Sequence, residues 1–198
     1  MSRRRRRRKK IRDKWRSKSW YSIYLPPYLG EGKIAETLAD DAAKLVGRTI
    51  DVSLSELTGD ITQDYVTLRL QITGVDGDKA STNFKGHYFT RDFLRVKVRR
   101  RRTLIDGVYD VTTKDNSRLR VTVMVITTRK ITAAKGNAVR RTVRDYLERK
   151  AKELDYAQLV GEIVSGKVAS ELVPLVRKIS PIEFVGVVKS KLLERVAG

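Results

Sequence analysis

The hydrophobic periodicity of this 198-residue chain changes near residue 138, from the alternation typical of strands to the repeat typical of helices. Before that point Val66, Leu68, Leu70 and Ile72 alternate with polar residues along 64–73, which predicts a strand with one buried face. After it, apolar residues recur at steps of three and four. This order predicts an α+β protein whose antiparallel β region precedes a helical region.

A β-hairpin is the clearest element of the β region. Leu119, Val121, Val123 and Val125 share one face of a strand over 120–126, and the polar stretch 114–117 (KDNS) joins it to the segment before. The other elements predicted here are strands at 107–113, 50–54 and 80–84, a turn at 75–78, and a short helix over 41–46 that ends at Gly47.

The last sixty residues predict three helices and a strand. The first helix runs from 138 to 154, and Asp155 is a candidate N-cap for the second, whose apolar side holds Leu159 and Ile163. A third helix is predicted over 167–173, because Pro174 disturbs its continuation. After Pro181 the stretch EFVGVV is rich in β-branched and aromatic residues, which favours a strand.

Positive charge dominates the composition, with a formal net charge of +20 and a pI near 10.4. The first twenty residues carry twelve cations against Asp13 alone, which makes +11 and leaves +9 for the rest. An arm of this kind is expected to be disordered when the protein is alone. Charge in both parts indicates a polyanionic partner, and the arm supplies these candidate RNA-binding residues: Arg3, Arg4, Arg5, Arg6, Arg7, Arg8, Lys9, Lys10, Arg12, Lys14, Arg16 and Lys18.

Further cationic clusters lie in the body of the chain. One of them puts seven positive charges into the twelve residues 91–102. Arginine makes forked contacts to phosphate, so its excess over lysine in these runs favours nucleic acid over a merely solvated face. The candidate RNA-binding residues here are Lys85, Arg91, Arg95, Lys97, Arg99, Arg100, Arg101, Arg102, Arg129, Lys130, Lys135, Arg140, Arg141 and Arg144.

Aromatic residues are interleaved with the basic arm or follow it. Trp15 and Trp20 are candidates either to stack on unpaired bases or to pin the arm to the β region, and the sequence favours neither role. Tyr24 and Tyr28, beside two prolines, favour anchoring.

Catalytic and metal-binding signatures find almost no support. The chain has no cysteine and one histidine, His87, for which a structural role is expected. The stretch 161–167 resembles a phosphate-binding loop, but Val168 replaces the hydroxyl residue that ligates magnesium. Asp76-Gly77-Asp78 starts like a calcium loop, yet Ala80 replaces the third ligand. We therefore expect no enzyme, no cofactor and no metal, and a soluble intracellular protein without a membrane span.

Several strings, in this order along the chain, resemble the eukaryote-type small-subunit ribosomal protein one family of archaea and eukaryotes. They are GRTIDVSLSEL at 47–57, TNFKG at 82–86 followed by TRD at 90–92, VYDVTTKD at 108–115, and KISPI at 178–182 followed by KSKLL at 189–193. The resemblance covers about 13–193. The chain has a longer arginine run at its start and lacks the extended tail of the eukaryotic members, which favours an archaeal member.

The resemblance implies a fold and a place of action. The fold is an antiparallel β-barrel-like domain with flanking C-terminal helices, in which Thr90 opens a short helix although Leu94, Val96 and Val98 alternate like a strand. The implied function is that of a structural constituent of the small ribosomal subunit. It would be cytoplasmic and ribosome-bound on the platform near the messenger exit, with small-subunit rRNA, nearby messenger RNA and neighbouring ribosomal proteins as partners, and it would support assembly and translation.

The sequence divides into three expected segments: a basic rRNA-binding arm (1–20), an antiparallel β domain with short helices (21–137), and a helical region with a final strand (138–198). The expected mechanism is neutralisation of phosphates by an arm that orders only on binding, while the body fixes register by shape and charge. Two alternatives stay open, a non-ribosomal RNA-binding chaperone and a protein-binding adaptor.

Overall fold

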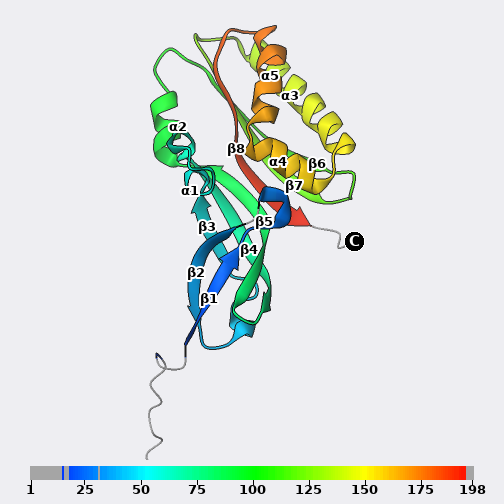
Figure 1. The fold of residues 1–198 in the computed structure, drawn as a ribbon. Helices are drawn as coiled ribbons and strands as arrows, with labels where there is room; N and C mark the ends of the chain where they lie inside the picture. The colour runs from blue at the N-terminus through cyan, green and yellow to red at the C-terminus, as the bar shows by residue number, and fades with distance from the viewer. Residues whose placement is uncertain (1–14, 16–17, 31, 195–198) are drawn as a thin grey trace, which may run out of the picture.

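A computed structural model describes residues 15, 18–30 and 32–194 of the chain (Figure 1). The predictions for the arm at residues 1–14, 16 and 17 lie outside these described residues. The strands are β1 (Ser19–Tyr24), β2 (Lys33–Ala39), β3 (Thr49–Ser53), β4 (Val66–Asp76), β5 (Lys79–Phe89), β6 (Leu104–Thr112), β7 (Arg118–Thr127) and β8 (Ile182–Glu194). The helices are α1 (Leu54–Thr58), α2 (Arg91–Lys97), α3 (Ala133–Glu153), α4 (Tyr156–Val164) and α5 (Lys167–Arg177), with 3₁₀ turns η1 (Pro27–Leu29), η2 (Ala42–Lys44) and η3 (Ile61–Gln63).

All eight strands belong to one branched sheet, and β5 is its branch point. One path runs β2-β1-β5-β8-β7-β6, while β4 pairs with β5 and β3 pairs with β4 off this path. Every pairing is antiparallel except that of β1 with β5. The long strand β5 therefore joins the β1–β4 end of the molecule to the β6–β8 end, which carries the helices (Figure 1).

The expected β-barrel-like closure is wrong, although the α+β class and the mainly antiparallel pairing are confirmed. Among the described strands, β2 pairs only with β1, β3 only with β4, and β6 only with β7, so the sheet keeps open edges. The division into three segments stays a prediction.

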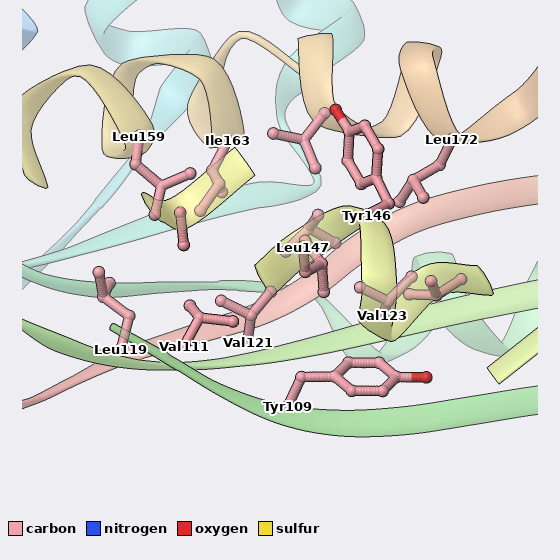
Figure 2. Close-up of a cluster of buried hydrophobic side chains, with 14 of the residues drawn as sticks. Tyr109, Val111, Leu119, Val121, Val123, Tyr146, Leu147, Leu159, Ile163 and Leu172 are labelled. Carbon is pink, nitrogen blue, oxygen red and sulfur yellow. The ribbon is translucent and has the colours of Figure 1, made fainter. Parts of the chain in front are cut away.

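The main core lies between strands β6–β8 and helices α3–α5. Figure 2 shows side chains of β6 and β7, among them Val111, Leu119 and Val121, below those of the helices, among them Leu147 and Leu159. On the strands, these residues occupy the alternate positions that the sequence predicts to be buried. On the helices, they belong to the apolar stripe that the sequence predicts. A smaller core around Ile23 and Ile72 fills the β1–β4 end.

Most predicted elements are confirmed. The alternating residues of β4 and β7 are buried, and the β6–β7 hairpin turns at 114–117, where Asn116 takes the left-handed conformation with φ 57°. Asp155 caps α4 in a capping box with Gln158. Thr90 stands at the N-cap of α2 as expected, but within the described structure its side chain makes no capping hydrogen bond.

Several boundaries differ from the predictions. The helix expected at 41–46 is only the 3₁₀ turn η2, although Gly47 does follow with φ 89°, and strand β2 was missed. Helix α5 continues through Pro174 to Arg177, because Val168, Leu172 and Val176 form one buried stripe on both sides of the proline. Burial of this stripe outweighs the lost backbone hydrogen bond.

Strand β5 runs past the predicted 80–84 to Phe89, and Leu54 begins α1 instead of ending a strand. The stretch that resembles a phosphate-binding loop lies in α4 and the start of α5, so no strand precedes it as that motif requires. The stretch 75–78 is the β4–β5 turn, with Gly77 at φ 59°.

Candidate nucleic-acid interface

Two loops that are distant in sequence are joined at one end of the sheet. The Thr127 backbone N–H donates to the Thr103 carbonyl at 3.1 Å, and the Thr103 N–H donates to the Thr127 hydroxyl at 3.1 Å. The Ile131 N–H donates to the Thr103 hydroxyl at 3.2 Å. The loop that follows α2 and the loop that follows β7 are therefore held side by side.

This junction brings together cations that the sequence shows as separate clusters. We call them the basic end, which consists of Arg99, Arg100, Arg101, Arg102, Arg129 and Lys130. Arg102 is half-buried and pairs with Glu183 at 3.0 Å. Among the described residues, Arg100, Arg101, Arg129 and Lys130 have no carboxylate within ion-pair distance, and all four are exposed. The basic end therefore presents uncompensated positive charge, which attracts a polyanion.

An aromatic cluster fixes helix α2 beside the basic end. Phe93 of α2 stacks on Tyr65 with a centroid distance of 3.9 Å and an interplanar angle of 8°, and it contacts Phe89 and Phe184 edge-on. The ammonium of Lys97 lies 5.2 Å from the centre of the Phe93 ring. Aromatic and cation–π contacts of this kind hold the helix on the sheet.

The other cations of α2 point to solvent. Arg91 and Arg95 are exposed. Arg95 lies 3.9 Å from Asp92, an exposed pair that contributes little to stability. Both arginines therefore extend the positive surface of the basic end along α2.

Helix α3 carries the remaining cations of the helical region. Lys135 lies in its first turn and is exposed. Arg140 is tied to β6, because its Nε donates to the Asp106 carbonyl at 3.1 Å. Arg141 and Arg144 are exposed on the same helix. These residues lie along α3 and not within the basic end.

The start of the described chain lies at the opposite end of the molecule from α2 (Figure 1). Trp15 and Trp20 are 71% and 61% exposed, and the Lys18 ammonium lies 4.0 Å from the centre of the Trp15 ring. Because both indoles are exposed, the structure does not distinguish between the two predicted roles, stacking on unpaired bases and holding the arm on the β region.

Tyr28 confirms its predicted anchoring role. Its hydroxyl donates to the Asn83 side-chain oxygen at 2.7 Å and accepts from the Phe84 N–H at 3.0 Å. Tyr24 lies in β1, where its carbonyl accepts from the Thr82 hydroxyl at 2.7 Å. Both residues thus tie the N-terminal segment to β5.

Lys85 is separated from the other candidates. It lies on β5 in a hollow at the junction of β4, β5 and β8, where it donates to the Gln71 side chain at 3.0 Å. Arg69, Lys189 and Lys191 line the same hollow and were missed by the sequence reasoning. The pattern Lys189-Ser190-Lys191, which continues the alternation of the final strand, is the signal that could have found the two lysines.

His87 is structural, as expected. It is 1% exposed, its Nε2 lies 2.9 Å from the Val187 carbonyl, and its Nδ1 lies 2.6 Å from the Ser190 hydroxyl. Burial lowers its pKa to about 4. Within the described part of the chain no group of three or more histidines, cysteines and carboxylates could hold a metal, and no helix is long and apolar enough to span a membrane.

Comparison with known proteins decides the family. The profile of the Ribosomal S3Ae family matches residues 6–196. The chain belongs to this family. Family membership makes the protein a structural ribosomal protein and not an enzyme.

Relatives named small ribosomal subunit protein eS1 are similar over nearly the whole chain. That of Desulfurococcus amylolyticus is 45% identical over 183 residues, which cover 92% of this chain and 86% of the relative. Those of Staphylothermus marinus and Saccharolobus solfataricus are 40% and 38% identical, covering 95% and 93% of this chain and 89% and 88% of theirs. These archaeal relatives agree with the resemblance seen in the sequence.

Proposed function

We propose that this protein is a constituent of the small ribosomal subunit that binds small-subunit rRNA by neutralising its phosphates. The observation that carries the proposal is the basic end, where hydrogen bonds between Thr103 and Thr127 gather six cations from two distant loops, of which Arg102 alone is paired with a carboxylate among the described residues. Such a cluster repels itself unless an anion lies against it. In a ribosomal family that anion is rRNA.

The arm and the body have different tasks in this proposal. The folded body, with α2 fixed by the stacked rings of Phe93 and Tyr65, presents its arginines in one arrangement and so sets the register on the RNA. The basic arm adds many phosphate contacts of modest individual strength, so the loss of any one arginine in it has little effect. Its charge lowers the repulsion between phosphates that approach one another. The position on the platform near the messenger exit rests on the family resemblance alone.

Crosslinking of RNA to the native protein in cells tests the proposal. We expect crosslinked nucleotides to concentrate in small-subunit rRNA, with peptides from the arm and from 91–102. Crosslinks scattered over unrelated RNAs would overturn it in favour of a general chaperone, and a lack of RNA crosslinks would favour a protein adaptor.

A charge variant tests the basic end itself. The triple variant Arg100→Gln, Arg129→Gln and Lys130→Gln is compared with a control that removes the same charge from exposed positions elsewhere, namely Arg149→Gln, Lys152→Gln and Arg177→Gln. The slope of the logarithm of rRNA affinity against the logarithm of salt concentration should become shallower by about 2.1 to 2.7 in the first variant only. Equal slopes in both variants would contradict the assignment.

A further inference from the structure

A second cationic site lies on the open face of the sheet, away from the basic end. At the point where β8 leaves β5, a hollow of about 280 Å³ is lined by four cations, one from β4, one from β5 and two from β8. They are Arg69, Lys85, Lys189 and Lys191. None of the described residues that line it is acidic, and the lining histidine, His87, has a pKa lowered to about 4 by burial and is neutral.

Strand register explains why these cations meet. Lys191 pairs with Arg120 of β7 on one side and with Gly86 of β5 on the other, and Gly86 in turn pairs with Arg69 of β4. Paired residues share a face of the sheet, so these residues form one row across it. Gly86 contributes no side chain to the middle of the row. Lys189, two residues before Lys191 on the same strand, lies on the same face at roughly 6.6 Å along the strand.

Not all of this charge is available to a partner. Arg69 makes a two-pronged ion pair with Asp51, with both N···O distances 2.7 Å, and this pair holds the pKa of the carboxyl below its usual range. Arg120, in the same row, makes the equivalent pair with Asp110 at 2.7 and 2.8 Å. By contrast, the side chains of Lys189 and Lys191 are exposed and, within the described residues, make no hydrogen bond or ion pair.

Among the described residues, the hollow therefore holds three ammonium groups without an ion pair, those of Lys85, Lys189 and Lys191, beside Arg69, which is already neutralised. Lysine is a compact point charge that suits a phosphate oxygen. A stacked base is a poorer fit, because the guanidinium of Arg69 already lies 5.3 Å from the centre of the ring of Tyr88, which lines the hollow.

We propose that this hollow binds backbone phosphates of an RNA strand through Lys189 and Lys191, independently of base sequence. The proposal rests on the proposed function, since it assigns a second contact of the same protein with rRNA. Lys85, which donates to the neutral amide of Gln71, adds a third positive charge at the wall of the hollow. The hollow spans the junction of β5 and β8. RNA in it therefore lies where the β1–β4 end and the β6–β8 end of the molecule are joined.

A pair of double variants of the full chain tests the site. The first is Lys189→Gln with Lys191→Gln, and the matched control is Lys152→Gln with Lys178→Gln, which removes the same charge from exposed lysines outside the hollow. The probe is a small-subunit rRNA transcript, with affinity measured over a salt series. We expect the salt slope of the first variant to be shallower by about 1.4 to 1.8 and that of the control to be unchanged. Because both substituted lysines are exposed, thermal melting should match the parent protein.

An independent footprint separates contact from general charge. Modification of lysine amines by an acylating reagent should be slowed by bound rRNA at Lys189 and Lys191 but not at Lys152 and Lys178. The proposal for the hollow is wrong if the first variant keeps the salt slope of the parent protein and bound rRNA does not protect Lys189 and Lys191. Equal losses of slope in the two double variants would also refute it. Either result leaves rRNA binding by the protein intact. The parent protein should also bind small-subunit rRNA more tightly than unrelated RNA of equal length. If it does not, the proposed function is wrong, and so is the proposal for the hollow that rests on it.

Discussion

The buried His87 should make the stability of this protein fall in mild acid. It is the chain's one histidine, and the geometry fixes its neutral form. The Val187 carbonyl can only accept, so Nε2 carries the proton and donates to it, and Nδ1 accepts from the Ser190 hydroxyl. The Ser190 oxygen in turn accepts from the His87 backbone N–H at 3.2 Å. A second ring proton would disrupt this arrangement at a side chain that is only 1% exposed.

The size of the effect follows from the shift in pKa. Burial lowers the pKa of His87 from its ordinary value of 6.5 to about 4 in the folded protein, whereas the unfolded chain keeps the ordinary value. Between these values the unfolded chain binds more protons, so the free energy of unfolding falls as the pH falls. The slope reaches about 1 kcal/mol per pH unit midway between the two pKa values, where the unfolded chain binds almost one proton more than the folded protein, and the total loss from pH 6.5 to pH 4 is about 3 kcal/mol.

Two measurements check this reasoning. Denaturant unfolding between pH 7 and 4.5 should show the predicted slope, and the variant His87→Gln, although less stable overall, should show a flatter dependence in the same window. The single histidine also gives one Hε1 signal in NMR, and the chemical shift of this proton should not titrate between pH 8 and 5. A folded-state titration midpoint near 6.5, or equal pH slopes in both proteins, would refute the argument.

Four further substitutions test the packing. Gly86→Ala would place a Cβ against the Ser190 carbonyl oxygen, and we expect it to lower the free energy of unfolding in denaturant by about 1 to 3 kcal/mol. Gly161→Ala, with open space around it in α4, should raise this free energy by about 0.5 to 1 kcal/mol, and equal effects of the two substitutions would contradict the close approach of β5 and β8. Lys150→Met removes the ammonium that lies 3.0 Å from the carboxylates of both Glu162 and Glu171. The same assay should show a free energy of unfolding lower by about 1 to 2 kcal/mol, which is less than for a fully buried pair because the Glu171 side chain is 36% exposed. Phe93→Ala removes the stack under α2, so trypsin should cut within 91–102 faster than in the parent protein, and an unchanged rate would show that the stack does not hold the helix.

Much of the secondary structure could be predicted because its causes are local. The alternation of Val121, Val123 and Val125 sets a strand with one buried face wherever that strand lies. Asp155 begins α4 through a hydrogen-bond pattern that spans three residues. The excess of positive charge, and with it the expectation of a polyanionic partner, is likewise a property of the sequence alone.

Tertiary structure decided what local signals do not contain. Pro174 predicted the end of a helix, but the buried stripe on both sides of it carries the helix onward. The resemblance implied a barrel, but closure depends on which strands β5 pairs with along each of its edges.

The placement of the cations is decided in the same way. The sequence shows the arginine runs, yet hydrogen bonds between Thr103 and Thr127 bring two of them together. Lys189 and Lys191 meet Lys85 only because Ser190 pairs with His87, 103 positions away. A sequence therefore specifies the charge and the faces of its strands, whereas the partners of each strand follow from the lowest free energy of the whole packed chain.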